Sequence, residues 1–169
     1  MKHLYLLRHA QKAQNSEDAD TPLSAKGEEQ AKALGEWVRQ HDVTFDHILC
    51  SPALRTKQTF ELLNMKESSI ELEEVLYDSM MRSGQDLIDS LSSAIEKTAN
   101  NINNLLIIAH MPNLMRLCHF LSETISLEEN AILTFGYPSC GLVKIDLNIE
   151  SWADIKNARK AGKVSLLYS

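Results

Sequence analysis

Two apolar segments, far apart in the sequence, end in the same way. Leu4–Leu7 is followed at once by Arg8 and His9, and Leu105–Ala109 is followed by His110. Short, continuous apolar runs of this kind are typical of strands buried on both faces of a parallel sheet. Because ligands of such sheets bind just beyond the carboxyl ends of the strands, we expect these basic residues to lie at a functional edge.

A third predicted strand, Phe45–Cys50, leads into a helix that carries another arginine. Ser51 is a favourable helix cap and Pro52 suits a first helical position, so we predict a helix from there to about residue 64, with Arg55 in its first turns. If the three strands are parallel neighbours, two histidines and two arginines converge on one rim of the sheet. A phosphoryl group is the ligand that such a cluster fits best.

The rest of the chain alternates between helical and extended patterns. We expect a helix from Ser24, as its N-cap, to Gln40, because apolar residues recur there at three- and four-residue spacing. Further helices are predicted over 87–95 and 114–121, a strand or an extended passage over 70–77, strands over 142–147 and 164–168, and an irregular segment with room for a short helical turn over 123–139. Strands that alternate with helices predict an α/β fold, a three-layer sandwich with a mostly parallel central sheet, in a single domain over residues 1–169.

Composition excludes several classes of protein. The net charge of −6, without a dominant basic stripe, argues against nucleic acid as a partner and makes a local cluster of arginine and histidine more informative. The three cysteines show no paired or zinc-binding spacing, which indicates reduced thiols in the cytoplasm. The first apolar run is too short for a signal peptide, and no stretch is long enough to span a membrane.

The residue types at the predicted rim suit phosphoryl transfer. A neutral imidazole, His9 or His110, is a competent nucleophile toward phosphorus, and a second imidazole, if cationic, can donate to the phosphoryl oxygens. Arg8 and Arg55 offer planar forks that can bind two oxygens at once. Ser51, at the amino end of the Arg55 helix, would add a backbone dipole that points at the anion.

One alternative nucleophile is Cys50, because cysteine phosphatases use a cysteine and an arginine that flank a loop of five residues. Here only four residues separate Cys50 from Arg55, and Pro52 has no N–H to offer to a phosphate. We therefore interpret Cys50 as a buried strand residue.

Four blocks of sequence, in this order, resemble the histidine phosphatase superfamily. They are Leu-Leu-Arg8-His9-Ala10, Thr21-Pro22-Leu23-Ser24-Ala25-Lys26-Gly27, Ser51-Pro52-Ala53-Leu54-Arg55-Thr56-Lys57-Gln58-Thr59 and Ala109-His110-Met111-Pro112. The short SixA-type phosphohistidine phosphatases are the branch that the chain resembles most. Two departures are the alanine after His9, where glycine is commonest in the family, and Thr21, where many short members have arginine.

The resemblance implies a phosphoglycerate mutase-like fold and a phosphohistidine intermediate on His9. It implies that Arg8, Arg55 and His110 complete the phosphate pocket, and that no metal and no organic cofactor takes part. Larger members place an acidic residue in the middle of the chain as a general acid. Asp78 fits that position, although a solvated loop carboxylate is an equal reading of it.

From these residues we expect a phosphatase, and a phosphohistidine-bearing signalling or phosphotransfer protein as its substrate and partner. Few residues between the Arg55 helix and the strand before His110 remain to build a lid, and an open pocket suits a phosphorylated protein side chain. Two alternatives stay open. One is a phosphatase or mutase for a small phosphorylated metabolite, and the other is a module that binds phosphorylated ligands without turnover. We expect a cytoplasmic monomer.

Overall fold

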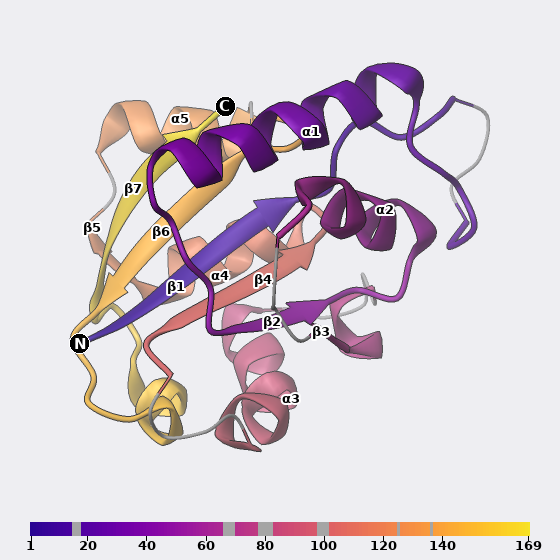
Figure 1. Cartoon of the computed structure of the whole chain (residues 1–169). Coiled ribbons are helices and arrows are strands. Elements are labelled where there is room, and N and C mark those ends of the chain that lie inside the picture. Colours follow the sequence, from indigo (N-terminus) through magenta and orange to yellow (C-terminus); the bar gives the residue numbers. More distant parts are fainter. Residues whose placement is uncertain (15–17, 66–69, 78–82, 98–101, 125, 136) are drawn as a thin grey trace.

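A computed structural model describes residues 1–14, 18–65, 70–77, 83–97, 102–124, 126–135 and 137–169. The sheet in this part of the chain has seven strands in the order β3-β2-β4-β1-β6-β7-β5, and helices lie on both of its faces (Figure 1). The predicted α/β three-layer sandwich is therefore confirmed, and its fold is phosphoglycerate mutase-like. The sheet is mostly parallel, with β6 antiparallel to both of its neighbours, β1 and β7.

The elements have the following bounds. The strands are β1 (Lys2–Arg8), β2 (His47–Cys50), β3 (Ile70–Leu72), β4 (Asn104–Ala109), β5 (Ser122–Thr124), β6 (Leu142–Leu147) and β7 (Gly162–Tyr168). The helices are α1 (Ala25–Gln40), α2 (Leu54–Leu63), α3 (Gly84–Lys97), α4 (Asn113–Leu121) and α5 (Leu127–Phe135), with 3₁₀ helices η1 (Glu74–Leu76) and η2 (Trp152–Asn157).

The three strands that precede the predicted site residues are parallel neighbours. In the register of the sheet, Arg8 of β1 lies beside Ala109 of β4, and Cys50 of β2 lies beside Ile108 of β4. The carboxyl ends of β1, β4 and β2 therefore meet at one edge of the sheet. The convergence that the sequence predicted is a consequence of this register.

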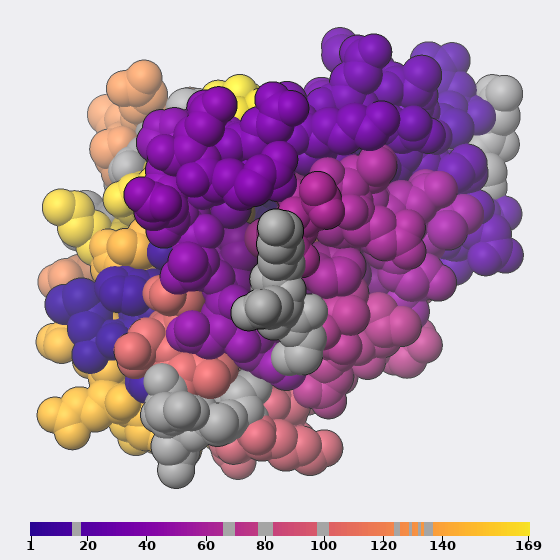
Figure 2. Space-filling view, viewed as in Figure 1, coloured from indigo at the N-terminus to yellow at the C-terminus, as the bar shows by residue number. Residues whose placement is uncertain are grey.

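Each face of the sheet has its own apolar core. Alternate side chains of the strands pack against α1 and α2 on one face, with Leu34 and Leu63 fully or almost fully buried. The other side chains pack against α3 and α4, where Leu91 and Leu117 are fully buried. Figure 2 shows the side chains of α1 and α2 forming the surface in front of the sheet. This packing on both faces explains why β1 and β4 are continuously apolar.

The start of α1 fixes the segment that follows β1. Ser24 caps the helix as predicted, because its side chain accepts from the backbone N–H of Gly27. The Ser24 hydroxyl and backbone N–H also donate to the carbonyl of Gln11. A Cβ atom at Gly27 would lie 2.0 Å from that carbonyl oxygen, so only glycine allows this close approach. The helix thereby holds the chain two residues beyond His9.

Two predictions of secondary structure are wrong. Helix α2 begins at Leu54, two residues later than Pro52, and its N-cap residue Ala53 makes no side-chain cap. The Ser51 hydroxyl is instead hydrogen-bonded to His110. The segment predicted to be irregular contains the nine-residue helix α5, in which Leu127 is 91% exposed. Because Leu127 faces solvent, the apolar residues of this segment do not mark one buried face of a helix in the sequence.

Candidate active site

The exit of β1 is held in place by the turn before β6. The backbone N–H of Arg8 donates to the carbonyl of Gly141, and the N–H of Cys140 donates to the carbonyl of Arg8. Nη1 of Arg8 donates to the carbonyl of Tyr137, whose own hydroxyl donates to the carbonyl of Leu6. Because these bonds fix both its backbone and its side chain, the Arg8 guanidinium is preorganised at the sheet edge.

His9 is buried and its tautomer is set by its neighbour in the chain. Its Nδ1 lies 2.7 Å from the carbonyl oxygen of Ala10, which can only accept, so Nδ1 carries the proton. Burial is the main reason why the pKa of His9 is lowered to about 4, and nearby positive charges lower it further. At neutral pH the ring is therefore neutral, and Nε2 carries a free lone pair. This is the form that a nucleophile requires.

His110 lies opposite His9, with the ring centroids 5.0 Å apart. Its Nε2 is 2.7 Å from the hydroxyl oxygen of Ser51. Burial, followed by the neighbouring imidazole and the two guanidinium groups, lowers the pKa of His110 to about 3. Without an anion the cationic form of His110 is thus strongly disfavoured at neutral pH. A phosphoryl dianion would oppose this shift, because it places negative charge beside the ring.

Ser51, expected to help bind the substrate, is fully buried behind His110. Its hydroxyl contacts His110 and does not belong to the lining of the pocket that the two histidines share. A second residue of the same block, Thr56, explains how the chain turns there. The Thr56 hydroxyl contacts the carbonyl oxygens of Ser51 and Ala53, each at 2.7 Å. This local bond stabilises the turn from β2 into α2.

Arg55 lies on the first turn of α2 and is only 8% exposed. Its Nη1 donates to the carbonyl of Asp18, 3.1 Å away, which turns the guanidinium toward the loop after β1. One turn further along the helix, the Thr59 hydroxyl accepts from the backbone N–H of Ala10 at 3.0 Å. The helix that supplies Arg55 therefore also fixes the residue next to His9.

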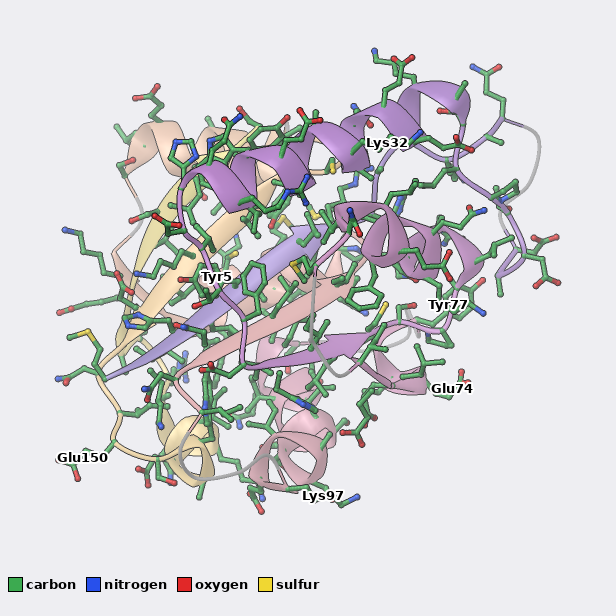
Figure 3. The ribbon with its side chains drawn as sticks, viewed as in Figure 1. Tyr5, Lys32, Glu74, Tyr77, Lys97 and Glu150 are labelled. Atoms are coloured by element: carbon green, nitrogen blue, oxygen red, sulfur yellow. The ribbon has the colours of Figure 1, made fainter. Side chains whose placement is uncertain are left out.

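Tyr77 is a neighbour of the site that the sequence analysis did not identify. Its ring meets the His110 ring edge-on at 5.6 Å, and the Arg55 guanidinium carbon lies 5.8 Å from its centroid. Figure 3 shows Tyr77 on the side of the molecule toward which β1, β2 and β4 point. No spacing rule in the sequence could have linked it to either residue. The next residue, Asp78, expected as a general acid, lies outside the described residues.

Three nitrogens of these side chains are buried without a hydrogen-bond partner. They are Nε of Arg8, Nε of Arg55 and Nδ1 of His110. Buried polar groups are nearly always paired, and unpaired ones cost free energy. The three belong to residues that line one hollow, and the charges of the two guanidinium groups there match an anion with several oxygen acceptors.

The hollow has a volume of about 830 Å³, which is far larger than a single phosphate needs. Arg8, His9, Arg55 and His110 are all among its lining residues. The lining also includes residues that the sequence analysis placed in a surface loop or left aside: Gln11, Lys12, Ala13, Gln14, Met111 and Ser139. A polar rim therefore surrounds the cluster, with room for more of a substrate than its phosphoryl group.

Cys50 has the properties of a core residue. It is fully buried, and burial raises the pKa of its thiol to about 12. A thiol in that state is a poor nucleophile at neutral pH. The interpretation of Cys50 as a buried strand residue is confirmed.

A metal site and a membrane-spanning helix are two features that the sequence gave no reason to expect. Within the described ranges, no three His, Cys, Asp or Glu side chains gather in a way that could hold a metal ion. The helices in that part of the chain also lack the combination of length and apolar character needed to cross a bilayer.

The fold and the site together define a class: an α/β protein with a phosphoglycerate mutase-like sheet, in which two histidines and two arginines at the carboxyl edge of the strands line one pocket. The profile of the "Histidine phosphatase superfamily (branch 1)" matches residues 4–81, which include Arg8, His9 and Arg55. This match covers a little less than half of the chain, so it is the first part of the sequence that is similar to the histidine phosphatase superfamily.

Curated relatives match the first part of the chain. An uncharacterised protein of Picosynechococcus is 42% identical over 67 residues, which is 38% of this chain and 41% of that protein. A Salmonella choleraesuis protein named "Probable phosphoglycerate mutase GpmB" is 41% identical over 68 residues, or 37% of this chain and 31% of its own. The chain thus matches less than half of the length of either relative.

Solved structures match almost the whole chain. The SixA protein of Nakamurella multipartitia has a TM-score of 0.75 at 23% identity, covering 98% of this chain and 94% of its own. The protein histidine phosphatase SixA, complexed with tungstate, has a TM-score of 0.74 at 18% identity, covering 99% and 96%. The α-ribazole phosphatase of Shigella flexneri has a TM-score of 0.63 at 22% identity, covering 99% and 96%. Because the sequence identities to these structures are only 18–23%, the similarity shows a shared fold and not a shared activity.

Proposed function

We propose that the protein is a phosphatase that works through a covalent phosphohistidine intermediate on His9. The observation that carries the proposal is the state of His9: a neutral ring, protonated on Nδ1, with its Nε2 lone pair free in a pocket that also holds two guanidinium groups. A similar SixA structure is complexed with tungstate, a tetrahedral oxyanion like phosphate, which supports an oxyanion as the ligand.

In the first step Nε2 of His9 attacks the phosphorus atom in line with the leaving group. A bond forms between Nε2 and phosphorus, and the bond from phosphorus to the leaving atom breaks. Arg8 and Arg55 neutralise the phosphoryl oxygens, which is most of what catalysis of this reaction requires. His110, held by Ser51 and beside Tyr77, faces the same oxygens.

In the second step a water molecule attacks phosphorus from the same open side of the pocket. An oxygen–phosphorus bond forms and the bond to Nε2 breaks, so that His9 regains its lone pair. The proton of the attacking water passes to solvent or to the inorganic phosphate that departs. No redox step and no further reactant besides water is needed.

We propose a phosphohistidine side chain of a protein as the substrate. The leaving imidazole of a phosphohistidine can take its proton from solvent, so its hydrolysis does not depend on a positioned acid, whereas an alkyl phosphate needs one to protonate its leaving oxygen. The volume of about 830 Å³ and the polar rim also suit a side chain that a larger partner presents.

A phosphatase or mutase for a small phosphorylated metabolite is the second candidate. It is favoured by the names of two similar proteins, the Salmonella phosphoglycerate mutase relative and the Shigella α-ribazole phosphatase. A mutase would have to return the phosphoryl group from His9 to an organic acceptor instead of to water.

We further propose that the protein acts in the cytoplasm as a monomer. Its three cysteines are buried as free thiols, as expected in a reducing compartment. Its partner in this proposal is the phosphorylated protein, and its negative net charge disfavours nucleic acid.

The test compares kcat/KM for a phosphohistidine-bearing protein, sugar phosphates, phosphoglycerates and an aryl phosphate, with His9→Ala as the matched control. We expect turnover of the phosphohistidine protein to exceed that of the metabolites, and the control to be inactive on all of them. Preferred hydrolysis of a metabolite would overturn the substrate. Transfer of the phosphoryl group to an acceptor would identify a mutase. Binding of phosphorylated ligands without turnover by the parent would leave only a binding module.

A further inference from the structure

A second basic site lies away from the catalytic pocket, along the outer face of α4. It is a hollow of about 340 Å³ lined by Gly84, Arg116, His119, Phe120, Arg159 and Lys160, which we call the basic hollow. Three of the chain's 17 lysine and arginine residues and one of its six histidines gather there. Among the described residues of the lining, none is acidic. This concentration of positive charge contrasts with the net charge of −6 of the whole chain.

Three separate parts of the chain are locked together to build the basic hollow. A Cβ atom at Gly84, the first residue of α3, would lie 2.5 Å from the carbonyl oxygen of Arg116 and 2.5 Å from Cβ of Phe120. Only glycine therefore lets α3 approach α4 so closely. The turn before β7 is tied to α4 as well, since the backbone N–H of Lys160 donates to the carbonyl of Phe120 at 2.9 Å.

Lys160 occupies a backbone position that favours glycine. Its φ of +58° lies in the left-handed region, where side chains with a Cβ atom are uncommon. Its amine donates to the carbonyl of His119 at 2.8 Å, which holds the charge against the end of α4. A cation is thus fixed at this point despite the unfavourable backbone conformation.

We infer that the basic hollow docks a short acidic segment of a protein partner. The positive charges of Arg159 and Lys160 beside one hollow match one or two carboxylates, and partly buried Phe120 offers an apolar contact between them. A long polyanion, such as nucleic acid, or an anionic membrane would also meet the negative remainder of the surface and be repelled. The site therefore selects a compact acidic group. This inference does not depend on the proposed phosphatase activity.

Helix α4 supplies part of the lining of the basic hollow and begins just after His110 and Met111, which line the catalytic pocket. Nη1 of Arg116 donates to the side-chain oxygen of Asn113, the first residue of α4, and His110 lies three residues before that. At a rise of about 1.5 Å per residue, His119 lies about 9 Å along the helix from Asn113. A partner bound at the hollow would thus stay close to the catalytic pocket.

The test is an amide NMR titration of the full chain with hexaglutamate, with hexaglutamine as the neutral control and hexathymidylate as the nucleic-acid probe. We expect hexaglutamate to shift the signals of the basic hollow, with an affinity that falls as salt rises, and hexaglutamine to shift none. Shifts confined to the catalytic pocket, or tighter binding of hexathymidylate, would overturn the inference.

Two charge-reversal variants test whether hexaglutamate binding depends on the basic hollow or on net charge alone. Arg159→Glu places a like charge beside the ligand, so we expect it to weaken hexaglutamate binding about tenfold or more. Lys97→Glu, at the other end of α3 (Figure 3), makes the same charge change outside the hollow and should leave the affinity within about twofold. Equal losses in both variants would reduce the effect to net charge and contradict a built site.

Lys160→Gly is a third variant, and we expect it to keep the fold. Glycine suits the φ of this position, so the variant should unfold at the same temperature as the parent or a higher one. We expect hexaglutamate affinity to fall severalfold because one cation is lost. Unchanged affinity would contradict a role of Lys160 in the basic hollow.

Discussion

The ends of β1 and β4 look alike in sequence but differ in what their histidines can do. Both strands are buried, parallel neighbours, and each ends in a histidine at the same edge of the sheet. The His9 ring is bound through Nδ1 to the backbone of the next residue, which leaves Nε2 free. The His110 ring is bound through Nε2 to Ser51, a side chain that follows the neighbouring strand β2.

This difference assigns separate roles to two rings that are only 5.0 Å apart. Nε2 of His9 has a free lone pair that can attack phosphorus, whereas Nε2 of His110 is bound to Ser51 and its Nδ1 is buried. The position of a histidine at a strand end therefore predicts that it belongs to a site. The hydrogen bond that its ring makes decides which part it takes. The predictions below test this division of roles, beginning with the largest expected effect.

Replacing the two histidines should separate their roles. We expect His9→Ala to lower kcat by about 10⁴-fold or more, as loss of a nucleophile does. His110→Ala should lower it by about 10²–10³-fold, as loss of one preorganised donor does, while covalent labelling persists. Steady-state kinetics on an aryl phosphate and mass analysis of quenched samples provide the measurement. Equal loss of labelling in both variants would contradict the difference between the two rings.

Arg55 lies near both histidines, and we expect its contribution to activity to depend on the shape of its guanidinium group as well as on its charge. Arg55→Lys keeps the positive charge but removes the planar fork, and we expect kcat/KM to fall by about 10²–10³-fold. The matched control is Arg159→Lys, the same exchange at an exposed position outside the catalytic pocket, which should leave turnover of an aryl phosphate unchanged. Near-parental kinetics of Arg55→Lys would show that its charge alone suffices.

Both buried histidines should make the protein less stable in acid. Their pKa values of about 4 and about 3 lie below the ordinary value of 6.5, so the unfolded chain binds more protons than the folded one as pH falls through 6.5. Each ring should therefore cost about 2 kcal/mol of unfolding free energy between pH 7 and pH 5. Urea unfolding of the parent and of His9→Asn should differ in this pH slope. Identical slopes would contradict a neutral, buried His9.

Tyr77 should act through its ring and not through its hydroxyl. Tyr77→Leu removes the aromatic contacts with Arg55 and His110, which are worth about 0.5–1.5 kcal/mol, so we expect kcat to fall about three- to tenfold. Tyr77→Phe keeps the ring and should stay within about twofold of the parent. A loss in the phenylalanine variant equal to that of leucine would instead assign a direct role to the phenol oxygen.

The sequence predicted the sheet edge well because the strands there are buried on both faces. Continuous apolar runs that stop at a basic residue identify β1 and β4, and β6 has the predicted bounds. The start of α2 was predicted wrongly because the Ser51 hydroxyl bonds to His110, a residue distant in the sequence, instead of capping the helix. Helix α5 was not predicted because its exposed Leu127 obscures the apolar spacing that identifies an amphipathic helix.

Within the candidate site, too, residues at the ends of strands were predictable and residues on connecting segments were not. Arg8, His9 and His110 were predictable because strand direction and register alone bring them together. Tyr77 contacts His110 and Arg55, and the rim residues Gln11, Lys12 and Ser139 line the pocket; all of them lie on connecting segments, whose paths depend on packing against other elements. No local pattern records such contacts, so only the folded chain reveals them.

The most direct test of the central claim is the location of the phosphoryl group during turnover. The parent protein is mixed with a phosphohistidine protein, quenched within milliseconds and analysed by intact mass and peptide mapping under neutral conditions. The account predicts one acid-labile phosphoryl group per chain, attached to Nε2 of His9 and absent from His9→Ala. A phosphoryl group on His110 or on Cys50, or turnover that survives in His9→Ala, would contradict it.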